Sequence, residues 1–281
     1  MTIRRIGFAY NPTNEAAVEL RERAEGWCRM HQVEHWAAQA QDFEVLCREL
    51  GTTDVLVVLG GDGTLLRAAR AVIQVDVPLL GVNLGKIGFL SKVEAGELEA
   101  VLAKLVAGEF TIDPRMALEA RLLPGGREAE AAIHHALNDV VVARGALARV
   151  TRLDVAIGPT HVATFIADGL VVSSPTGSTG YSFSAGGPIV APDSRNLIVT
   201  PIAAYLSTVR SVVVGPDQVV RCRIVDATEA IVSIDGREDV PAAVGDVVEV
   251  RALARPVQLV APAGSQPFWD LFRRKVELLP S

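Results

Sequence analysis

Apolar runs and amphipathic segments alternate along about the first 110 residues of the chain. The runs Ile3–Tyr10, Val55–Leu59 and Val77–Asn83 are apolar at nearly every position, which is typical of strands buried on both faces of a parallel sheet. Segments with the apolar spacing of helices follow them, at 14–32, 64–75 and 97–107. This alternation of strand and helix predicts an open α/β domain.

The pattern changes near Asp113-Pro114, after which helical periodicity becomes rare. From there to about residue 261, short Val- and Ile-rich segments are separated by Gly, Pro and Asp-Gly, which predicts an antiparallel, β-rich domain. The tail 266–279 is again helical in pattern, and we expect it to fold back onto the first domain. The expected organisation is therefore an α/β domain at 1–112, completed by the tail 262–281, and a β-rich domain at 113–261.

Composition and charge exclude several classes of function. The 281 residues are 49% hydrophobic, and the net charge of −6 comes without clustered Lys and Arg, which argues against a nucleic-acid partner. No apolar run approaches the roughly 20 residues of a membrane span, and the N-terminal segment predicts a strand rather than a signal peptide. The 3 cysteines and 5 histidines lack disulfide or zinc-site spacing, so we expect no protein metal ligands and a cytoplasmic location.

The first candidate for chemistry is Gly60-Gly61-Asp62-Gly63-Thr64, between a predicted buried strand and a predicted helix. Glycines let the backbone approach a ligand closely, and a helix N-terminus attracts phosphate through its N–H groups and dipole. Gly60, Gly61, Gly63 and Thr64 are therefore the predicted phosphate-binding residues. Asp62 follows a strand, where open α/β sheets bind ligands. In an isolated Gly-Asp-Gly the aspartate would more often be a cap, here for a helix beginning near Thr64, but the flanking glycines and the strand-turn-helix setting favour a functional role.

The second candidate is the stretch from Asp168 to Pro188, which is dense in hydroxyl residues and glycine and nearly uncharged. Such a segment suits a polar ligand that the backbone must approach closely. A flexible linker has a similar composition, but the embedded Pro175, Tyr181 and Phe183 favour an ordered loop. No G-x-S-x-G elbow occurs, so the stretch does not predict a serine hydrolase.

Three shorter motifs complete the set of candidates. Asn138-Asp139 begins a predicted strand; the amide can donate and accept as an adenine edge requires, and Asp139 could bond ribose hydroxyls, although such a pair is usually only a turn. Phe89, in the glycine-rich loop 81–90, could pack on a flat ring, although a core position is commoner for phenylalanine. Asp235-Gly236, between two strand-like runs, predicts a hairpin turn.

Four of these motifs, namely the turn 60–64, the loop 81–90, the pair Asn138-Asp139 and the stretch 168–188, resemble the NAD kinase family in their order and spacing along the chain. The resemblance runs from Ile6–Pro12 to Phe268–Lys275, which is nearly the whole chain. Diacylglycerol-type lipid kinases share the Gly-Gly-Asp-Gly-Thr turn and phosphofructokinases have a variant of it, so the stretch 168–188 is the more specific part. The resemblance implies an α/β N-terminal domain, a β-sandwich-like C-terminal domain, a cleft between them and a C-terminal helix packed on the first domain.

The resemblance also implies roles for individual residues. Asp62 is the expected general base, Phe89 an aromatic beside the adenine, and Asp168 a carboxylate near the nicotinamide end. The adenosine is expected at Asn138 and Asp139, where the family more often has Asn-Glu. The other residues expected to contact NAD are Gly63, Thr176, Thr179, Gly180, Tyr181 and Ser184. Gly180 stands where the family usually has alanine.

The implied activity is phosphoryl transfer to the 2′-hydroxyl of the adenosine ribose of NAD, giving NADP. The donor is expected to be ATP or a similar compound such as polyphosphate, with a divalent metal ion, Mg²⁺, on its phosphates. The family also implies a homodimer or homotetramer whose sites borrow residues across subunits.

Two other functions stay open at this point. A lipid or small-alcohol kinase could use the same glycine-rich turn, but it would not need the stretch 168–188. A non-catalytic dinucleotide sensor would be favoured by loss of the carboxylate at position 62, and Asp62 is present.

Overall fold

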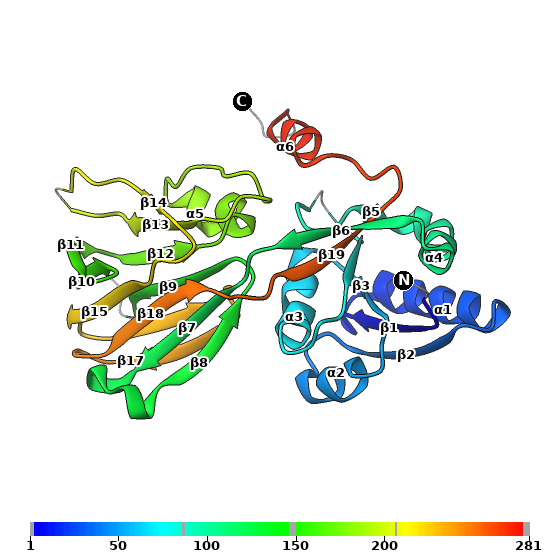
Figure 1. Ribbon diagram of the computed structural model, residues 1–281, viewed down its shortest axis with the longest axis horizontal. Coiled ribbons are helices and arrows are strands. Elements are labelled where there is room, and N and C mark those ends of the chain that lie inside the picture. The colour runs from blue at the N-terminus through cyan, green and yellow to red at the C-terminus, as the bar shows by residue number, and fades with distance from the viewer. Residues whose placement is uncertain (1–2, 86–87, 146–149, 206, 278–281) are drawn as a thin grey trace. The chain divides into compact units, whose positions relative to one another are not determined.

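The chain divides into two compact units, one formed by residues 1–114 and 257–281 and the other by residues 115–256 (Figure 1). The structure is a computed structural model, and it describes residues 3–85, 88–145, 150–205 and 207–277. Lys86 and Ile87 of the predicted loop 81–90, and the last residues of the predicted tail helix, lie outside this described part.

The first unit is built on a seven-stranded sheet with parallel pairing along its centre. Its strands lie in the order β2 (Glu34–Gln39), β1 (Arg5–Tyr10), β3 (Val55–Leu59), β4 (Leu79–Asn83), β19 (Val257–Pro262) and β6 (Phe110–Arg115), with β5 (Val93–Glu94) beside β4. Parallel neighbours require crossover connections, which the helices between the strands supply. The predicted open α/β domain is thereby confirmed.

Helices cover both faces of this sheet, which explains its continuous apolar strands (Figure 1). Val55, Val57 and Leu59 of β3 belong to one core cluster with α1 (Glu15–Met30) and α4 (Leu98–Ala107). The opposite face meets α3 (Asp62–Val72), since a Cβ at Gly81 would come within 2.7 Å of Leu65. Helix α2 (Phe43–Leu50) packs beside α3.

The hydrophobic pattern does not predict β2 and α2. Strand β2 lies at the edge of the sheet, and only one of its six residues is buried, so it lacks the apolar run of its neighbours. Helix α2 has eight residues and only two buried side chains, Leu46 and Leu50, which is too short for a clear helical period.

The second unit consists of two six-stranded sheets with antiparallel pairing. The first sheet has the order β11 (Thr160–Ala167), β10 (Thr151–Ile157), β15 (Val220–Asp226), β18 (Val247–Ala252), β7 (Leu118–Leu123) and β8 (Ala132–Ala136). The second has the order β14 (Val212–Val214), β13 (Leu197–Ile202), β12 (Gly169–Ser173), β9 (Asp139–Arg144), β16 (Ala230–Ile234) and β17 (Glu238–Ala242). The antiparallel β domain is confirmed.

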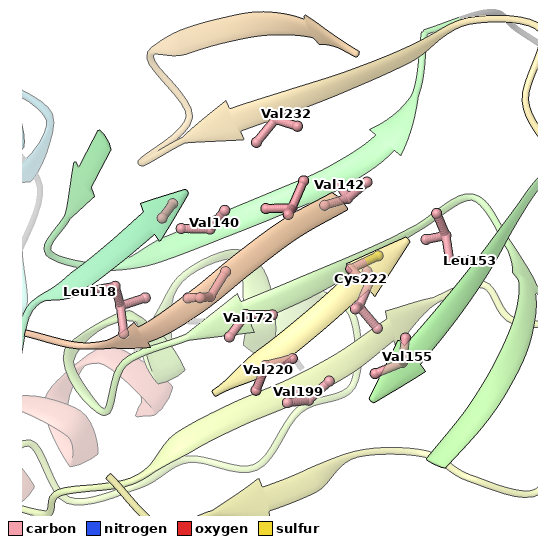
Figure 2. Close-up of a cluster of buried hydrophobic side chains, with 14 of the residues drawn as sticks. Leu118, Val140, Val142, Leu153, Val155, Val172, Val199, Val220, Cys222 and Val232 are labelled. Atoms are coloured by element: carbon pink, nitrogen blue, oxygen red, sulfur yellow. The ribbon is translucent and has the colours of Figure 1, made fainter. Parts of the chain in front are cut away.

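Side chains from both sheets form one hydrophobic core (Figure 2). Leu118, Leu153 and Val220 come from the first sheet, and Val142 and Val172 from the second. Alternate residues of a strand point to opposite faces, so each sheet contributes every second side chain to the core. The arrangement is the sandwich that the family resemblance implies.

The C-terminal helix α6 (Phe268–Glu277) belongs to the first unit. The rings of Phe268 and Phe272 lie 6.0 Å and 6.5 Å from that of Phe89, so the tail folds back onto the first unit as predicted. Residues 257–261 differ from the expectation, because β19 joins the parallel sheet instead of the β-rich unit. Its apolar pattern does not reveal which sheet it will complete. None of the helices in the described part is long and apolar enough to span a membrane.

Leu153→Ala tests the sandwich core. Leu153 is fully buried between the sheets, and the substitution should lower the free energy of unfolding by about 2–5 kcal/mol through lost apolar burial and a cavity. Val162→Ala on the neighbouring strand is the control, because Val162 is 40% exposed and should cost far less. Urea unfolding of both variants gives the comparison, and equal losses would contradict the assigned core.

Candidate active site

The glycine-rich turn connects β3 to α3 in the first unit. The amide of Gly60 donates to the carbonyl of Val82 on the neighbouring strand, so the turn begins at the carboxyl edge of the sheet. Gly60 lies so close to Thr64 that a Cβ would come within 2.5 Å of the threonine hydroxyl oxygen. The turn therefore brings the backbone to the N-terminus of α3, which is a favourable position for phosphate.

Asp62 is the first residue of α3, and its carboxylate does not cap that helix. The N-cap is Gly61, which offers no side-chain hydrogen bond. The Asp62 oxygens instead accept the amides of Phe89, at 2.8 Å, and Leu90, at 3.2 Å. The alternative of an aspartate cap on a helix beginning near Thr64 is wrong, because the helix begins two residues earlier and the carboxylate is turned to the loop after β4.

Gly88 explains how that loop approaches Asp62 so closely. A Cβ at Gly88 would lie 2.3 Å from one carboxylate oxygen, inside any tolerable contact. Glycine is needed here for a close approach. Two amide-to-carboxylate hydrogen bonds thus fasten the loop after β4 to the glycine-rich turn.

Phe89 lies in a cluster of aromatic rings and contacts a positively charged side chain. Its ring packs with Phe268 and Phe272 of α6, and the Lys275 ammonium lies 3.9 Å from its centroid, in cation–π contact. Partial burial lowers the pKa of Lys275, and the charge of Asp62 opposes that shift. The tail helix therefore brings positive charge to the neighbourhood of Asp62, a feature that linear spacing could not reveal.

In the second unit, three of the predicted NAD-binding residues line one cavity of about 440 Å³: Asn138, Asp139 and Tyr181. The cavity lies on the second sheet, at the start of β9 and beside α5 (Tyr181–Ser184). Gly180 is adjacent to the cavity, since a Cβ there would lie 3.7 Å from the side-chain nitrogen Nδ2 of Asn138 and 3.9 Å from a carboxyl oxygen of Asp139. An alanine at that position would thus be in ordinary contact with the pair.

The stretch after β12 is an ordered loop and not a flexible linker. Ser174, Thr176, Gly177, Ser178 and Ser182 are all buried. The Ser174 hydroxyl donates to the carbonyl of Leu137 at 2.6 Å, and its amide donates to the carbonyl of Asn138 at 2.8 Å. Ser174 thereby binds the loop to residues 137 and 138, which directly precede β9.

Two buried polar atoms of the predicted site have no hydrogen-bond partner among the described residues. They are the Oδ1 atom of Asn138 and the Oγ1 atom of Thr176. A buried polar atom without a partner costs roughly 1–3 kcal/mol, so such atoms usually bond a water molecule or a ligand. Asn138 Oδ1 is an acceptor, which is the group that an exocyclic amine such as that of adenine requires.

The carboxyl group of Asp139 is buried beside a second carboxyl group, that of Asp235. Burial, followed by the negative charge of Asp235, raises the pKa of Asp139 to about 7. Asp235 accepts the amides of Leu137, Asn138 and Asp139. The sequence pattern of Asp235-Gly236 indicates only a hairpin. Because Asp-Gly is itself a favoured pair for such turns, no local signal marks Asp235 as a site residue.

Other predicted residues lie outside the cavity. Asp168 is at the far end of β12, because Gly169 pairs with Ala143 whereas Ser173 pairs with Asp139. Its carboxylate forms an ion pair with Arg144 at 2.8 Å. Thr179 is partly exposed and Ser184 is exposed on the same loop. The structure thus brings Asn138, Asp139, Gly180 and Tyr181 together but leaves Asp168 apart.

A metal ion has no ready-made protein site in the described part of the chain, where no group of three or more His, Cys, Asp or Glu side chains could hold one.

The fold and these residues define a class of protein, a phosphotransferase that acts on a nucleotide. Family models describe the same two parts: an ATP-NAD kinase N-terminal domain matches residues 3–110, and an ATP-NAD kinase C-terminal domain matches residues 137–261. The chain belongs to the ATP-NAD kinase family.

Relatives and solved structures agree with this assignment. The NAD kinase of Heliobacterium modesticaldum is 39% identical, over 97% of this chain and 98% of its own length. The NAD kinase of Symbiobacterium thermophilum is 43% identical, over 80% of this chain and 79% of its own length. Among structures, yeast NADH kinase complexed with NADH superposes with a TM-score of 0.85 at 22% identity, covering 100% of this chain and 89% of its own. The NAD kinase from Archaeoglobus fulgidus in complex with ATP has a TM-score of 0.77 at 25% identity, covering 98% and 100%.

The buried carboxyl group of Asp139 should make stability depend on pH. The pKa of Asp139 is higher in the folded protein than in the unfolded chain, where it is near 3.9. Its contribution to the free energy of unfolding is therefore fully present below that unfolded value and is lost as pH rises through about 7. Relative to Asp139→Asn, the protein should lose on the order of 1 kcal/mol of unfolding free energy per pH unit between pH 5 and 7. Urea unfolding at pH 5, 6, 7 and 8 measures this difference, and parallel pH profiles would contradict it.

Proposed function

We propose that this protein is an NAD kinase that transfers the terminal phosphoryl group of ATP to the 2′-hydroxyl of the adenosine ribose of NAD. Membership of the ATP-NAD kinase family, on both halves of the chain, supports the reaction class. The observation that carries the assignment of substrate is the cavity of the second unit, where Asn138 and Asp139 offer an unpaired acceptor and a carboxyl group.

Adenosine recognition is the proposed task of that cavity. The Asn138 side chain pairs with the adenine edge, accepting from the exocyclic amine through Oδ1. Asp139 accepts a hydrogen bond from a ribose hydroxyl, and Tyr181, which is 48% exposed, offers a ring and a hydroxyl at the rim. Thr176 Oγ1, buried without a described partner, adds a second group for the dinucleotide.

Asp62 is the proposed general base. A ribose hydroxyl is a poor nucleophile at neutral pH, and a carboxylate in hydrogen-bond reach accepts its proton as the new bond to phosphorus forms. The amides of Phe89 and Leu90 hold both oxygens of Asp62. A carboxylate has about four lone-pair sites, so two remain for the substrate hydroxyl.

The phosphates of the donor are assigned to the glycine-rich turn. Gly60, Gly61, Gly63 and Thr64 bring the backbone to the N-terminus of α3, where N–H groups and the helix dipole favour negative charge. Mg²⁺ enters as the complex with ATP and neutralises charge on the phosphates. Lys275 adds positive charge in the same unit, in electrostatic contact with Asp62.

The proposal extends to assembly. Asp168 lies at the opposite end of β12 from the Asn138-Asp139 pair of the same chain, so a role of Asp168 at the nicotinamide end is best met by a site shared between two copies. Exposed aromatic side chains on the second unit, Phe183 and Tyr205, suit burial between copies. A homodimer or homotetramer is therefore the proposed form, and the cytoplasm is its proposed location.

Incubation of the purified protein with ATP, Mg²⁺ and NAD, followed by an enzymatic assay for NADP, tests the function. Formation of NADP supports it. Binding of NAD without turnover would favour a dinucleotide sensor, and phosphorylation of a lipid or small alcohol instead would favour the rival kinase class.

Asn138→Ala tests adenosine recognition. The substitution removes the adenine partner, and the apparent KM for NAD should rise about tenfold while kcat changes little. Asn196→Ala is the matched control, since Asn196 is in the same unit but donates to the carbonyl of Val214, away from the cavity. Steady-state kinetics with varied NAD measure both, and an unchanged KM for Asn138→Ala would remove the residue from the site.

Asp62→Asn tests the general base. Loss of the proton acceptor should lower kcat by roughly 10²–10⁴-fold, with little change in NAD affinity. Asn keeps one acceptor for the loop amides, so a modest loss of stability is also expected. Asp54→Asn is the control for that effect, because Asp54 accepts the amides of Arg4 and Arg5 in the same unit. A folded Asp62→Asn protein with near-normal kcat would exclude the proposed base.

Sedimentation or light scattering tests assembly. We expect a mass of at least twice the 29.9 kDa of the chain at concentrations where the enzyme is active. An active species with the mass of one chain would refute the shared site.

A further inference from the structure

We propose that Asp235 is a positioning residue for the substrate, whose carboxylate holds the backbone of Leu137, Asn138 and Asp139 in the conformation that presents adenosine-binding side chains. This inference rests on the proposed function, because it assigns a further residue to the recognition of NAD. The Asp235-Gly236 pair, which by pattern is only a hairpin turn, thereby becomes part of the site.

Three hydrogen bonds carry the inference. One Asp235 oxygen accepts the amide of Leu137 at 2.9 Å, and the other accepts those of Asn138 at 2.7 Å and Asp139 at 3.1 Å. The Asp235 amide in turn donates to the carbonyl of Asp139 at 3.0 Å. A carboxylate can serve three neighbouring donors at once, whereas an amide side chain has a single acceptor oxygen.

The same segment is held from its other side by the loop after β12. Ser174 donates through its hydroxyl to the Leu137 carbonyl and through its amide to the Asn138 carbonyl. The backbone amides of residues 137–139 therefore donate to Asp235, and the carbonyls of residues 137 and 138 accept from Ser174. With the backbone fixed on both sides, the side chains of Asn138 and Asp139 are directed to the cavity that Asp235 also lines.

The backbone of the hairpin is compatible with this contact. Asp235 has φ +52° and Gly236 has φ +63°, so both central residues of the turn are left-handed. Asp-Gly, like Asn-Gly, is a strongly favoured pair for such turns. Asp235 therefore suits the backbone of the turn, and its carboxylate is left to accept the amides of residues 137–139.

The negative charge of Asp235 also influences the protonation of Asp139. Asp139 faces Asp235, and Asp239 of β17 and Tyr181 of α5 line the same cavity. Burial raises the pKa of Asp235, and the three amide bonds and the charge of Arg237 oppose the rise. Asp139 has no comparable set of amide donors among the described residues, so it takes the proton first, with a pKa of about 7. Recognition of a ribose hydroxyl by ionised Asp139 is then weakened on the acid side of neutrality.

Asp235→Asn tests the proposal by calorimetric titration of NAD alone, without a phosphoryl donor, from pH 5.5 to 8.5. At pH 8 we expect NAD affinity to fall about tenfold or more, because one oxygen cannot serve three amides. The acid-side fall in affinity should also move to lower pH than in the unsubstituted protein, because the negative charge that raises the Asp139 pKa is gone. A purely structural role for Asp235 would not move that midpoint.

Asp246→Asn is the matched control. Asp246 also accepts backbone amides at a turn of the same unit, from Gly125 and Ala243, both at 2.8 Å, but it does not line the cavity. It should lose comparable stability while keeping the affinity and the pH midpoint. An Asp235→Asn protein with the affinity and midpoint of the unsubstituted protein overturns the proposal.

Asp139→Asn keeps the proposal testable if Asp235→Asn does not fold. The substitution removes the carboxyl group that Asp235 influences. The variant should bind NAD more weakly, with an affinity that does not depend on pH between 6 and 8. A fall in affinity on the acid side that persists in this variant would overturn the electrostatic coupling. An unsubstituted protein that neither binds NAD nor forms NADP would refute the proposed function itself. An active unsubstituted protein with an unaffected Asp235→Asn variant would refute only the role of Asp235.

Discussion

Carboxylates that accept neighbouring backbone amides set the geometry of the candidate site in each unit. Asp62 accepts Phe89 and Leu90, which ties the glycine-rich turn to the loop after β4. Asp235 accepts three successive amides at the start of β9. Amide-to-carboxylate hydrogen bonds are shorter and stronger than hydrogen bonds between neutral groups. The loops that carry the functional groups are therefore held by short-range electrostatics, on sheets that supply the rigidity.

The two scaffolds suit the tasks assigned to them. A parallel sheet covered by helices ends its strands at one edge, where a turn and a helix N-terminus can receive phosphates. A sandwich leaves the outer face of each sheet available, and the cavity of the second unit uses that face at the start of β9. In the proposed function, phosphate binding and adenosine recognition fall to different units, and each half of the chain matches its own ATP-NAD kinase domain model.

Much of the fold could be predicted because hydrophobic periodicity is a local property. The apolar run of β3 indicates burial on both faces, and all five of its residues are buried. The edge strand β2 and the short helix α2 lack such a signal. Strand β19 has the right pattern, but its partners are β4 and β6, more than a hundred residues earlier in the chain, so its sheet is decided by long-range pairing.

The sequence by itself determined the alternation of elements, the glycine-rich turn, the Asn138-Asp139 pair and the family, because each depends on residue types close together in the chain. Tertiary structure alone decided that Asp62 binds the loop of Gly88 and does not cap its helix, that Lys275 lies on the ring of Phe89, and that Asp235 holds Asn138 from 97 residues away. The physical reason is the same in each case. A carboxylate or ammonium that is partly or fully removed from water pairs with the donors or rings that folding brings to it, and no local sequence pattern records which ones these are.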